Sequence, residues 1–249
     1  MKKYKNTIEF EVYGNYALFA DPVTRVGGEK TSYHIPTYEA LKGIVESVYW
    51  KPTIMWIVDA VRIMNPIQTE TKGIRPINYS GGNDLAYYTY LKNVRYQIRA
   101  HFEQNLNHPE LADDWNENKH HNIAKRMVQR GGARRDVFLG TRECQAFVEP
   151  CVFGEGSGYY DNMVGEIAYG FMYHGITYAD EAILPEEKGK MTVNFWNPVM
   201  TAGGIIEFIR PEKCTQKRFI KEMEVRKFGK NQFSGLKEFD KKELEEVEN

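Results

Sequence analysis

Alternation of apolar and polar side chains predicts four strands in the first 150 residues. Residues 8–13 alternate as expected for a strand with one buried face, and residues 94–102 repeat that pattern. Residues 53–64 form a continuous apolar, β-branched run, which is typical of a buried strand. Residues 142–149 alternate again and end at Pro150. The segment between residues 65 and 85 is rich in Gly and Pro and predicts a loop or hairpin.

A 3.6-residue period predicts two helices between these strands. Residues 37–50 carry one apolar stripe between Pro36 and Pro52, and residues 117–129 carry another that ends before two glycines. The stripes consist of Leu41, Ile44, Val45 and Val48 in the first helix and of Ile123, Ala124, Met127 and Val128 in the second. The order is therefore βαββαβ. It predicts an α+β chain with an N-terminal ferredoxin-like domain, the architecture of RNA-recognition domains.

After residue 150 the pattern predicts strands alone. Residues 165–173, 191–196 and 204–209 each suit a strand, which indicates a small C-terminal three-stranded antiparallel β-sheet. The expected organisation is a ferredoxin-like domain at 1–150, a β-sheet domain at 151–225 and a charged tail at 226–249. No octamer typical of RNA-recognition strands is present, so a standard aromatic platform is not expected.

Composition limits the cellular compartments and the kinds of cofactor or metal chemistry that we expect. The chain has 249 residues, of which 42% are hydrophobic, and a formal net charge of -1. Three widely spaced cysteines favour a reducing, cytoplasmic setting over a disulfide framework. Neither a signal peptide nor a membrane-spanning run is expected. No phosphate-binding loop or metal-ligand spacing occurs, so we expect neither a cofactor nor a metal ion.

The charge is unevenly distributed along the chain. Residues 115–142 hold seven Lys or Arg against two acidic residues, and residues 210–230 hold eight against three. The tail from residue 237 is acidic, and its negative charge offsets both basic stretches in the net charge of the whole chain. Either basic stretch is a solvated face or a binding surface for an anionic partner. Gly27-Gly28, between Arg25 and Lys30, is an ordinary turn or a close approach to phosphate.

Three side chains are candidates for acid–base chemistry. His120 shares the apolar face of the second helix and lies at its start, where free N–H groups attract phosphate, and Lys119 adds a cation. The alternative is a polar helix cap. Tyr49 lies at the edge of the first helix's stripe, where amphipathic packing is the usual explanation and nothing local indicates catalysis.

Long segments of the chain resemble the CRISPR-associated Cas-five family, Dvulg subtype, the repeat-processing endoribonucleases of type I-C systems. The resemblance runs from about residue 8 to about residue 225. It is carried by YGNYALFADPVTRVGGEKTSY at 13–33, PTYEALKGIVESVYWKP at 36–52, PIQTETKGIRPI at 66–77, NKHHNIAKRMVQRGGARRDVFLGTRECQAFVEP at 118–150 and the region 195–210.

This resemblance implies a catalytic set of Tyr49, Lys119 and His120. Family members cut precursor CRISPR RNA at the 3′ base of the repeat hairpin without a metal ion, by attack of a 2′-hydroxyl that leaves a 2′,3′-cyclic phosphate. His120 would then be general base or acid, Lys119 the charge stabiliser and Tyr49 a proton-transferring partner. His121 departs from the family's pattern and would share this role or contact RNA.

The resemblance also implies the partners. The repeat hairpin would be held by Lys125, Arg126, Arg130, Arg134 and Arg135, with Arg25 and Lys30 as weaker candidates. Family members retain the 5′ handle of the mature guide within a type I-C Cascade surveillance complex. Two alternatives remain: a non-catalytic subunit that caps the guide's 5′ handle, and a metal-dependent nuclease that acts on DNA.

Overall fold

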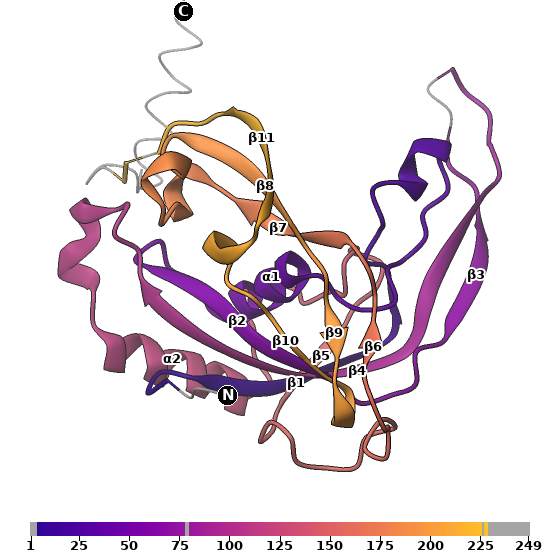
Figure 1. Ribbon diagram of the computed structural model, residues 1–249, viewed down its shortest axis with the longest axis horizontal. Helices are drawn as coiled ribbons and strands as arrows, with labels where there is room; N and C mark the ends of the chain where they lie inside the picture. The colour runs from indigo at the N-terminus through magenta and orange to yellow at the C-terminus, as the bar shows by residue number, and fades with distance from the viewer. Residues whose placement is uncertain (1–3, 78–79, 226, 229–249) are drawn as a thin grey trace, which may run out of the picture.

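The computed structural model describes residues 4–77, 80–225 and 227–228. Its largest unit is a six-stranded antiparallel sheet in the order β10-β2-β4-β1-β5, with β3 paired to β4 (Figure 1). The strands are β1 (Ile8–Ala17), β2 (Ile54–Ile63), β3 (Thr69–Ile74), β4 (Ala86–Gln104), β5 (Phe147–Pro150) and β10 (Ile205–Glu207). The four strands predicted before residue 150 therefore exist, and the segment predicted as a loop or hairpin at 65–85 supplies β3, which forms a hairpin with the start of β4.

Two α-helices occupy the predicted places. Helix α1 (Tyr38–Val48) begins after Thr37, whose side chain accepts a hydrogen bond from Ala40 N. Helix α2 (Glu117–Gln129) begins after Asn116, whose side chain accepts from Lys119 N. Such N-caps satisfy backbone donors that have no partner inside the helix. Short 3₁₀ helices lie at Thr24–Gly27, Pro109–Asp114, Ala179–Glu181, Pro185–Glu187, Ala202–Gly204 and Pro211–Lys213.

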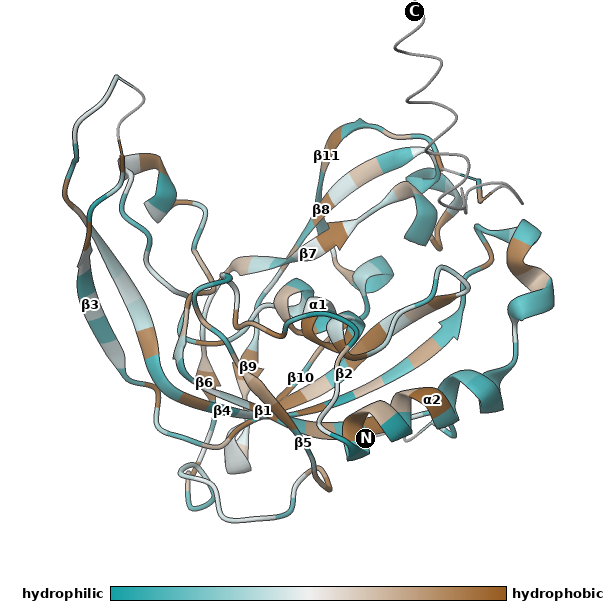
Figure 2. Cartoon of the chain, turned by 180° about the vertical axis from the view of Figure 1, so that it is seen from behind, coloured by the Kyte–Doolittle hydropathy of each residue, from teal (hydrophilic) through white to brown (hydrophobic). Residues whose placement is uncertain are grey.

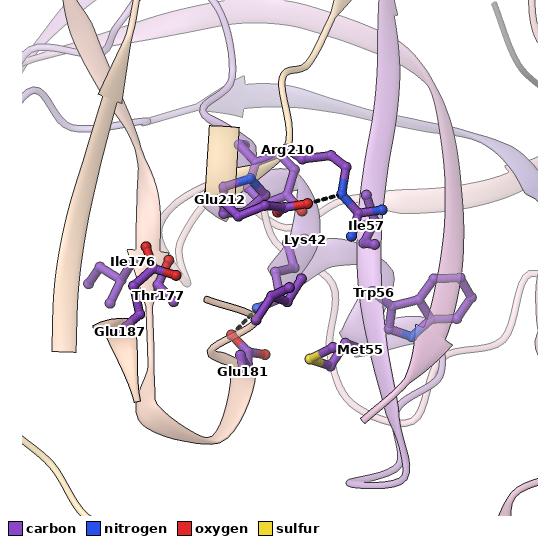
Figure 3. A pocket seen from close by; sticks show the side chains of 13 residues that line it. Lys42, Met55, Trp56, Ile57, Ile176, Thr177, Glu181, Glu187, Arg210 and Glu212 are labelled. Carbon is purple, nitrogen blue, oxygen red and sulfur yellow. Dashed lines mark hydrogen bonds and ion pairs between the residues drawn. The ribbon is translucent and has the colours of Figure 1, made fainter. Parts of the chain in front are cut away.

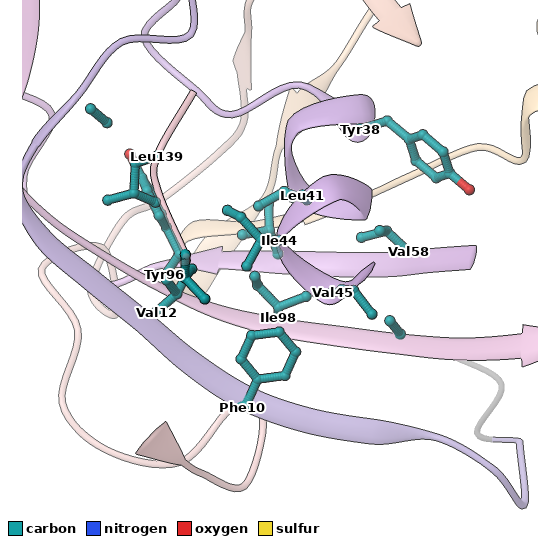
Figure 4. Packing of buried hydrophobic residues seen from close by; sticks show 14 of the residues in the cluster. Phe10, Val12, Tyr38, Leu41, Ile44, Val45, Val58, Tyr96, Ile98 and Leu139 are labelled. Carbon is teal, nitrogen blue, oxygen red and sulfur yellow. The ribbon is translucent and has the colours of Figure 1, made fainter. Parts of the chain in front are cut away.

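The apolar stripe of α1 packs on one face of the sheet (Figure 4). Leu41, Ile44 and Val45 meet Val12 and Ile98 from the two central strands, and all five are nearly or fully buried. Figure 2 shows hydrophobic residues concentrated where the helices face the strands. The core that the sequence pattern predicts is therefore the one that orients both helices.

The predicted lengths of two strands are wrong. Strand β4 begins at Ala86, eight residues before the predicted start, because its first part pairs with β3 in an arm that projects from the sheet (Figure 1). Strand β5 is only four residues long. The residues before it form a turn in which Leu139 N donates to Cys144 O at 2.8 Å. That local hydrogen bond replaces the sheet pairing that alternation alone predicts.

The chain beyond residue 150 forms sheets, but not with the predicted members. One sheet has the order β11-β8-β7, from β7 (Met172–Thr177), β8 (Lys190–Trp196) and β11 (Gln216–Glu222). A two-stranded sheet pairs β6 (Ile167–Ala168) with β9 (Val199–Met200). The prediction missed β11, whose residues are nearly all exposed and therefore show no alternation.

Strand β10 belongs to the larger sheet, not to the appended one. It pairs with β2, a strand buried along most of its length whose edge would otherwise lack backbone partners. Gly204 permits this pairing because its φ is 74° and a Cβ there would lie 2.6 Å from Ile63 O. The predicted boundary after residue 150 stays a prediction. The tail predicted at 226–249 lies outside the described residues except for 227–228. None of the helices formed by the described residues is long and apolar enough to cross a membrane.

Candidate active site

The fold brings Tyr49 and His120 together across 71 residues of sequence. The Tyr49 hydroxyl lies 2.8 Å from His120 Nδ1. Tyr49 is the residue that ends α1, with an extended backbone, and not a helical residue as expected. The helix stops there because Pro52 follows closely and disfavours helical conformation in the residue before it. Trp56 Nε1 donates to the Tyr49 carbonyl at 2.7 Å and fixes this end of the helix.

The imidazole of His120 is covered on every side. The residue is 0% exposed, and its ring lies between those of Tyr49, Phe102 and Trp115 at centroid distances of 6.1 to 6.2 Å. Position 120 therefore faces the body of the domain, as the helical period predicts. Its second ring nitrogen, Nε2, lies 3.1 Å from the backbone carbonyl of Asp114. Both nitrogens thus have protein partners.

Asp114 connects Lys119 to His120. Its carboxylate forms an ion pair with Lys119 Nζ and accepts a hydrogen bond from Thr53 Oγ1 at 2.8 Å. The same carboxylate lies 3.7 Å from His120 Nε2. The Lys119 side chain is 44% exposed, so its ammonium lies at the surface beside the buried imidazole. A single residue therefore fixes the position of both members of the Lys-His pair.

Burial sets the protonation states of this cluster. It lowers the pKa of His120 by more than the Asp114 carbonyl and carboxylate raise it, so the imidazole is neutral at pH 7. Burial, together with the charge of Asp114, raises the pKa of Tyr49 to about 12. Burial would also raise the pKa of Asp114, but hydrogen bonds from Lys119 and Thr53 outweigh that effect and lower it. At pH 7 the site contains a neutral base, a phenol, a carboxylate and an ammonium.

The hydrogen bonds select one imidazole tautomer. Because a carbonyl oxygen only accepts, Nε2 must carry the proton and donate to Asp114 O. Nδ1 is then the acceptor, and the Tyr49 hydroxyl donates to it. If another group donates a proton to the Tyr49 oxygen, the hydroxyl proton of Tyr49 can move to His120 Nδ1 at the same time.

His121 faces a different direction. Its Nε2 lies 3.1 Å from the carbonyl of Thr7, just before β1, and it has no contact with Tyr49 among the described interactions. Adjacent residues of a helix point about 100° apart, which explains the separation. His121 is therefore not positioned to replace His120 without rearrangement.

Most of the basic residues predicted to bind RNA lie along α2 and the loop after it. A cavity of about 660 Å³ is lined by Arg130, Arg134 and Arg135 together with strand β5, and we call it the basic groove. A second cavity of about 380 Å³ is lined by His121 and Lys125, and Gln129 and Pro150 line both. Arg126 is exposed on α2 but lines neither.

The loop that carries the arginines is attached to the end of α1. Arg134 N donates to Ser47 O at 2.8 Å, and Arg135 Nε donates to Ser47 Oγ at 3.3 Å. The Arg134 guanidinium lies 5.4 Å from the ring centroid of Trp50, the residue after Tyr49. One wall of the basic groove therefore borders the segment that holds Tyr49.

Arg25 and Lys30 lie elsewhere. They line a separate cavity of about 300 Å³ with Thr37 and Thr141. The Lys30 carbonyl accepts a hydrogen bond from Thr89 N of β4 at 2.8 Å, and Ser32 N donates to Thr89 O at 3.0 Å. This segment therefore lies beside the projecting arm, at the other end of the molecule from α2 (Figures 1 and 2). The structure does not bring them to the basic groove.

A further cavity is more enclosed but smaller, at about 40 Å³ (Figure 3). It lies between α1, β2 and the C-terminal segment. Charges that line it form ion pairs with one another: Lys42 with Glu181 at 2.5 Å, and Arg210 with Glu212. Neither Tyr49 nor His120 lines it. Within the described ranges, no group of three or more His, Cys, Asp or Glu side chains is arranged to hold a metal ion.

Asp114 is the residue of this site that the sequence did not reveal. Asp113-Asp114 appears as an adjacent acidic pair in a polar segment, and only the turn of the 3₁₀ helix Pro109–Asp114 directs residue 114 back toward α2. Asp114 precedes Lys119 by five residues and His120 by six, but it lies outside α2, so helical spacing does not predict that these side chains meet. Thr53, at the start of β2, gave no signal.

Comparison with known proteins identifies the family to which the chain belongs. The family model described as CRISPR-associated protein (Cas_Cas5) matches residues 7–207. A CRISPR pre-crRNA endoribonuclease Cas5d of Mannheimia succiniciproducens is 28% identical over an alignment of 164 residues, with 57% of this chain and 71% of that protein covered. The protein of the same name from Thermus thermophilus is 27% identical over an alignment of 152 residues, with 57% of this chain and 63% of that protein covered.

Two solved structures are similar over most of the chain. One, described as a CRISPR-associated protein, has a TM-score of 0.70 and 33% identity, with 85% of this chain and 96% of that chain covered. The other, a functionally uncharacterized protein from Streptococcus mutans, has a TM-score of 0.67, 33% identity and the same two coverages.

Proposed function

Because the chain belongs to the Cas5 family of CRISPR-associated proteins, Dvulg subtype, we propose that it is an endoribonuclease that cuts precursor CRISPR RNA within the repeat. The observation that carries this proposal is the hydrogen bond of 2.8 Å between Tyr49 and a neutral His120 beside the exposed ammonium of Lys119. These groups supply what cleavage by a neighbouring 2′-hydroxyl requires: a base, a proton path and a cation.

The reaction begins with proton removal from the 2′-hydroxyl. The Tyr49 oxygen accepts this proton while its own proton passes to His120 Nδ1, which leaves the imidazole charged. The 2′-oxygen then bonds to the adjacent phosphorus and the bond from phosphorus to the 5′-oxygen breaks. The products are a 2′,3′-cyclic phosphate and a 5′-hydroxyl, whose proton Lys119 or solvent supplies. No metal ion takes part in this scheme.

The ammonium of Lys119 stabilises the negative charge that develops on the phosphorane. Its ion pair with Asp114 holds it beside the imidazole, and its exposure leaves it accessible to a phosphate. Asp114 acts as a positioning residue: its carbonyl fixes the tautomer of His120 and its carboxylate fixes Lys119. The repeat lies along Lys125, Arg126 and the basic groove.

We assign the central part of the fold to the ferredoxin-like arrangement. In its support, the chain order is β1-α1-β2-β4-α2-β5 while the spatial order is β2-β4-β1-β5. This arrangement places the end of α1 and the start of α2 at neighbouring positions, as the Tyr49–His120 contact requires. After cutting, the protein retains the 5′ handle of the guide as a subunit of a type I-C Cascade complex.

The test is incubation of the purified protein with a synthetic repeat hairpin in EDTA. We expect one cut at the 3′ base of the hairpin, with a cyclic phosphate at the new 3′ end, and no cut in RNA with a 2′-deoxy nucleotide just upstream of that site. Cleavage of the deoxy substrate would contradict the mechanism. Cleavage that needs magnesium and extends to DNA would favour the metal-dependent nuclease.

One observation favours a non-catalytic subunit that only binds the guide's 5′ handle. His120 is fully buried with both nitrogens hydrogen-bonded, which is also how a structural histidine is accommodated. RNA that stays intact in the EDTA assay while it binds the protein would support this second function over cutting.

A further inference from the structure

Strand β5 carries a large aromatic side chain on the surface instead of in the core. Phe147 is 66% exposed, whereas the next residue, Val148, is 6% exposed and packs inward. Phe147 pairs across the sheet with Tyr13 of β1, and their ring centroids are 5.7 Å apart. Alternation along β5 therefore places an aromatic pair on the outer side of an edge strand.

The Tyr13 ring is fixed by a hydrogen bond, and the backbone that carries the aromatic pair is closely packed. The Tyr13 hydroxyl donates to Glu149 at 2.6 Å, which fixes the orientation of its ring. A Cβ on Gly14 would lie 2.8 Å from Gln145 O, so β1 and the segment before β5 are closely packed. Gly131, at the end of α2, would place a Cβ 3.1 Å from Val148 O. A rigid surface binds a ligand with less loss of conformational freedom than a mobile one.

The aromatic pair borders the basic groove. Tyr13 and Phe147 line the same cavity as Arg130, Arg134 and Arg135. These three arginines are exposed, and among the described residues none of them forms a salt bridge. Of the acidic residues in the cavity, Asp136 lies 4.0 Å from Arg142 and Glu149 accepts from Tyr13. Guanidinium groups without a carboxylate partner, beside an exposed ring, combine attraction for phosphate with a stacking surface for a base.

We infer that Phe147 and Tyr13 form a stacking site for the base of an unpaired nucleotide next to the repeat hairpin. Paired bases in a duplex are already stacked on their neighbours, whereas an unpaired base has a free face. The arginines of the basic groove hold the phosphates on either side of it. The site rests on the proposed function for the identity of the RNA, but it is separate from the catalytic residues.

Position along the helix separates this site from the chemistry. His120 and Arg130 lie at the two ends of α2, about 15 Å apart at the rise of an α-helix. None of the described contacts links Phe147 or Tyr13 to Tyr49, Lys119 or His120, so we assign the stacked base to a nucleotide other than the one that is cut. Loss of the ring should weaken binding and leave the rate of the bound complex unchanged.

The test measures binding of RNA that the protein is not expected to cut. The probe is a fluorescently labelled hairpin of the host's own CRISPR repeat, with unpaired flanks and 2′-fluoro groups in place of the 2′-hydroxyls. We expect Phe147→Ala to weaken binding about tenfold, in the range found when one stacking aromatic is removed. Phe147→Trp should bind within about twofold of the unchanged protein because indole stacks as well as phenyl does.

Phe171→Ala is the matched control. Phe171 is also exposed, at 61%, and stacks on Phe195 at 5.1 Å, but it lines no part of the basic groove. Its loss should leave RNA binding unchanged. If Phe147→Ala and Phe171→Ala both bind like the unchanged protein, the stacking site does not exist, and Phe147 belongs to a contact with another protein or to none.

An abasic scan identifies the nucleotide. Removing the base at one unpaired position should weaken binding to the unchanged protein and have no further effect on Phe147→Ala. Equal losses in both proteins at every position would overturn the inference. Failure of the proposed function is seen separately, because a protein that cuts no all-ribose repeat can still show this pattern of binding.

Discussion

The start and the end of α2 carry similar residue types in opposite surroundings. At the start, His120 is fully buried and Lys119 is paired with Asp114. At the end, Arg130, Arg134 and Arg135 are exposed and line an open groove. A buried group has its pKa and tautomer set by neighbours, whereas an exposed cation keeps its charge and attracts any phosphate nearby. The difference suggests chemistry at one end and retention of RNA at the other.

Removing the imidazole should have the largest effect. His120→Ala is expected to lower the cleavage rate on the order of 10²–10⁴-fold, the range for loss of a general acid or base, with little change in RNA binding. Tyr49→Phe should lower it similarly, since it removes the hydroxyl that is hydrogen-bonded to His120 Nδ1 and that the proposed mechanism uses to pass the proton. Single-turnover cleavage of the repeat hairpin measures both.

His121→Ala is the control for this experiment. His121 is bonded to Thr7 O and not to Tyr49, so its loss should leave the rate constant of the bound complex unchanged. A large fall in that rate for His121→Ala, with a normal rate for His120→Ala, would show that His121 is the catalytic histidine. The buried start of α2 would then not be the catalytic end of the helix.

Asp114→Asn should have a smaller effect and should also shift the pH dependence. The cleavage rate is expected to fall about tenfold because the ammonium of Lys119 loses a charged hydrogen-bond partner. The rate of the unchanged protein should rise with pH as His120 becomes neutral, and the midpoint of this rise should lie below the ordinary histidine value of about 6.5, because burial lowers the pKa of His120. The Asp114 charge raises that pKa, so its removal should move the acid limb to still lower pH.

The matched substitution is Asp113→Asn, at an exposed neighbour. It should change neither the rate nor the pH profile. A purely structural role of Asp114 would lower activity without moving the acid limb, so an unmoved limb in Asp114→Asn would show that the residue does not influence the protonation of His120.

At the other end of α2, Arg134→Ala should affect binding and not chemistry. Loss of one phosphate contact is expected to raise KM severalfold, to leave kcat unchanged and to reduce the slope of log affinity against log salt concentration by about 0.7 to 1. Binding titrations at several salt concentrations measure the slope. An unchanged slope together with a reduced kcat would place Arg134 at the catalytic end instead.

Arg210 tests whether any arginine has this effect. Its guanidinium is hydrogen-bonded to both Glu103 oxygens, at 2.7 and 2.9 Å, and also to Glu212. Because these contacts occupy it, Arg210→Met should leave RNA binding unchanged. An RNA affinity as reduced as that of Arg134→Ala would show that exposure does not distinguish the two arginines.

The ion pair between Arg210 and Glu103 should make the stability of the fold slightly sensitive to acid. Hydrogen bonds from Arg210, together with the His101 imidazole 3.7 Å away, lower the pKa of Glu103 to about 2, below its ordinary value of about 4.5. The stability that this shift contributes is present above about pH 4.5 and is lost as the pH falls toward 2. Thermal unfolding over this range should show a shallower acid dependence in Arg210→Met than in the unchanged protein.

Several elements were predictable because their patterns are local. The bounds of α2 coincide with the predicted residues 117–129, since an apolar stripe and a glycine stop define them. Strands β1 and β2 are likewise evident from alternation and from a β-branched run. The inward direction of His120 follows from the helical period alone. The buried start of α2 was thus accessible before any tertiary contact was known.

Other elements depend on partners distant in sequence. The predicted strand at 165–173 is interrupted by Gly165 and Gly170, whose φ values are 90° and 74°, and β7 begins only at Met172. Alternation ignores such backbone breaks. The exposed β11 has no alternation to recognise, and β10 joins β2 because of an edge that only the folded sheet creates.

For the candidate site, the residues by themselves determined which chemistry was available. They supplied an imidazole at a helix start, a lysine beside it and a cluster of arginines after it, and family resemblance added Tyr49. Only the tertiary structure decided that Tyr49 and His120 share a hydrogen bond, that Asp114 fixes Lys119, and that Phe147 lies exposed beside the arginines. Residue type and period are local properties, whereas tautomer, pKa and exposure depend on what the rest of the chain places around each side chain.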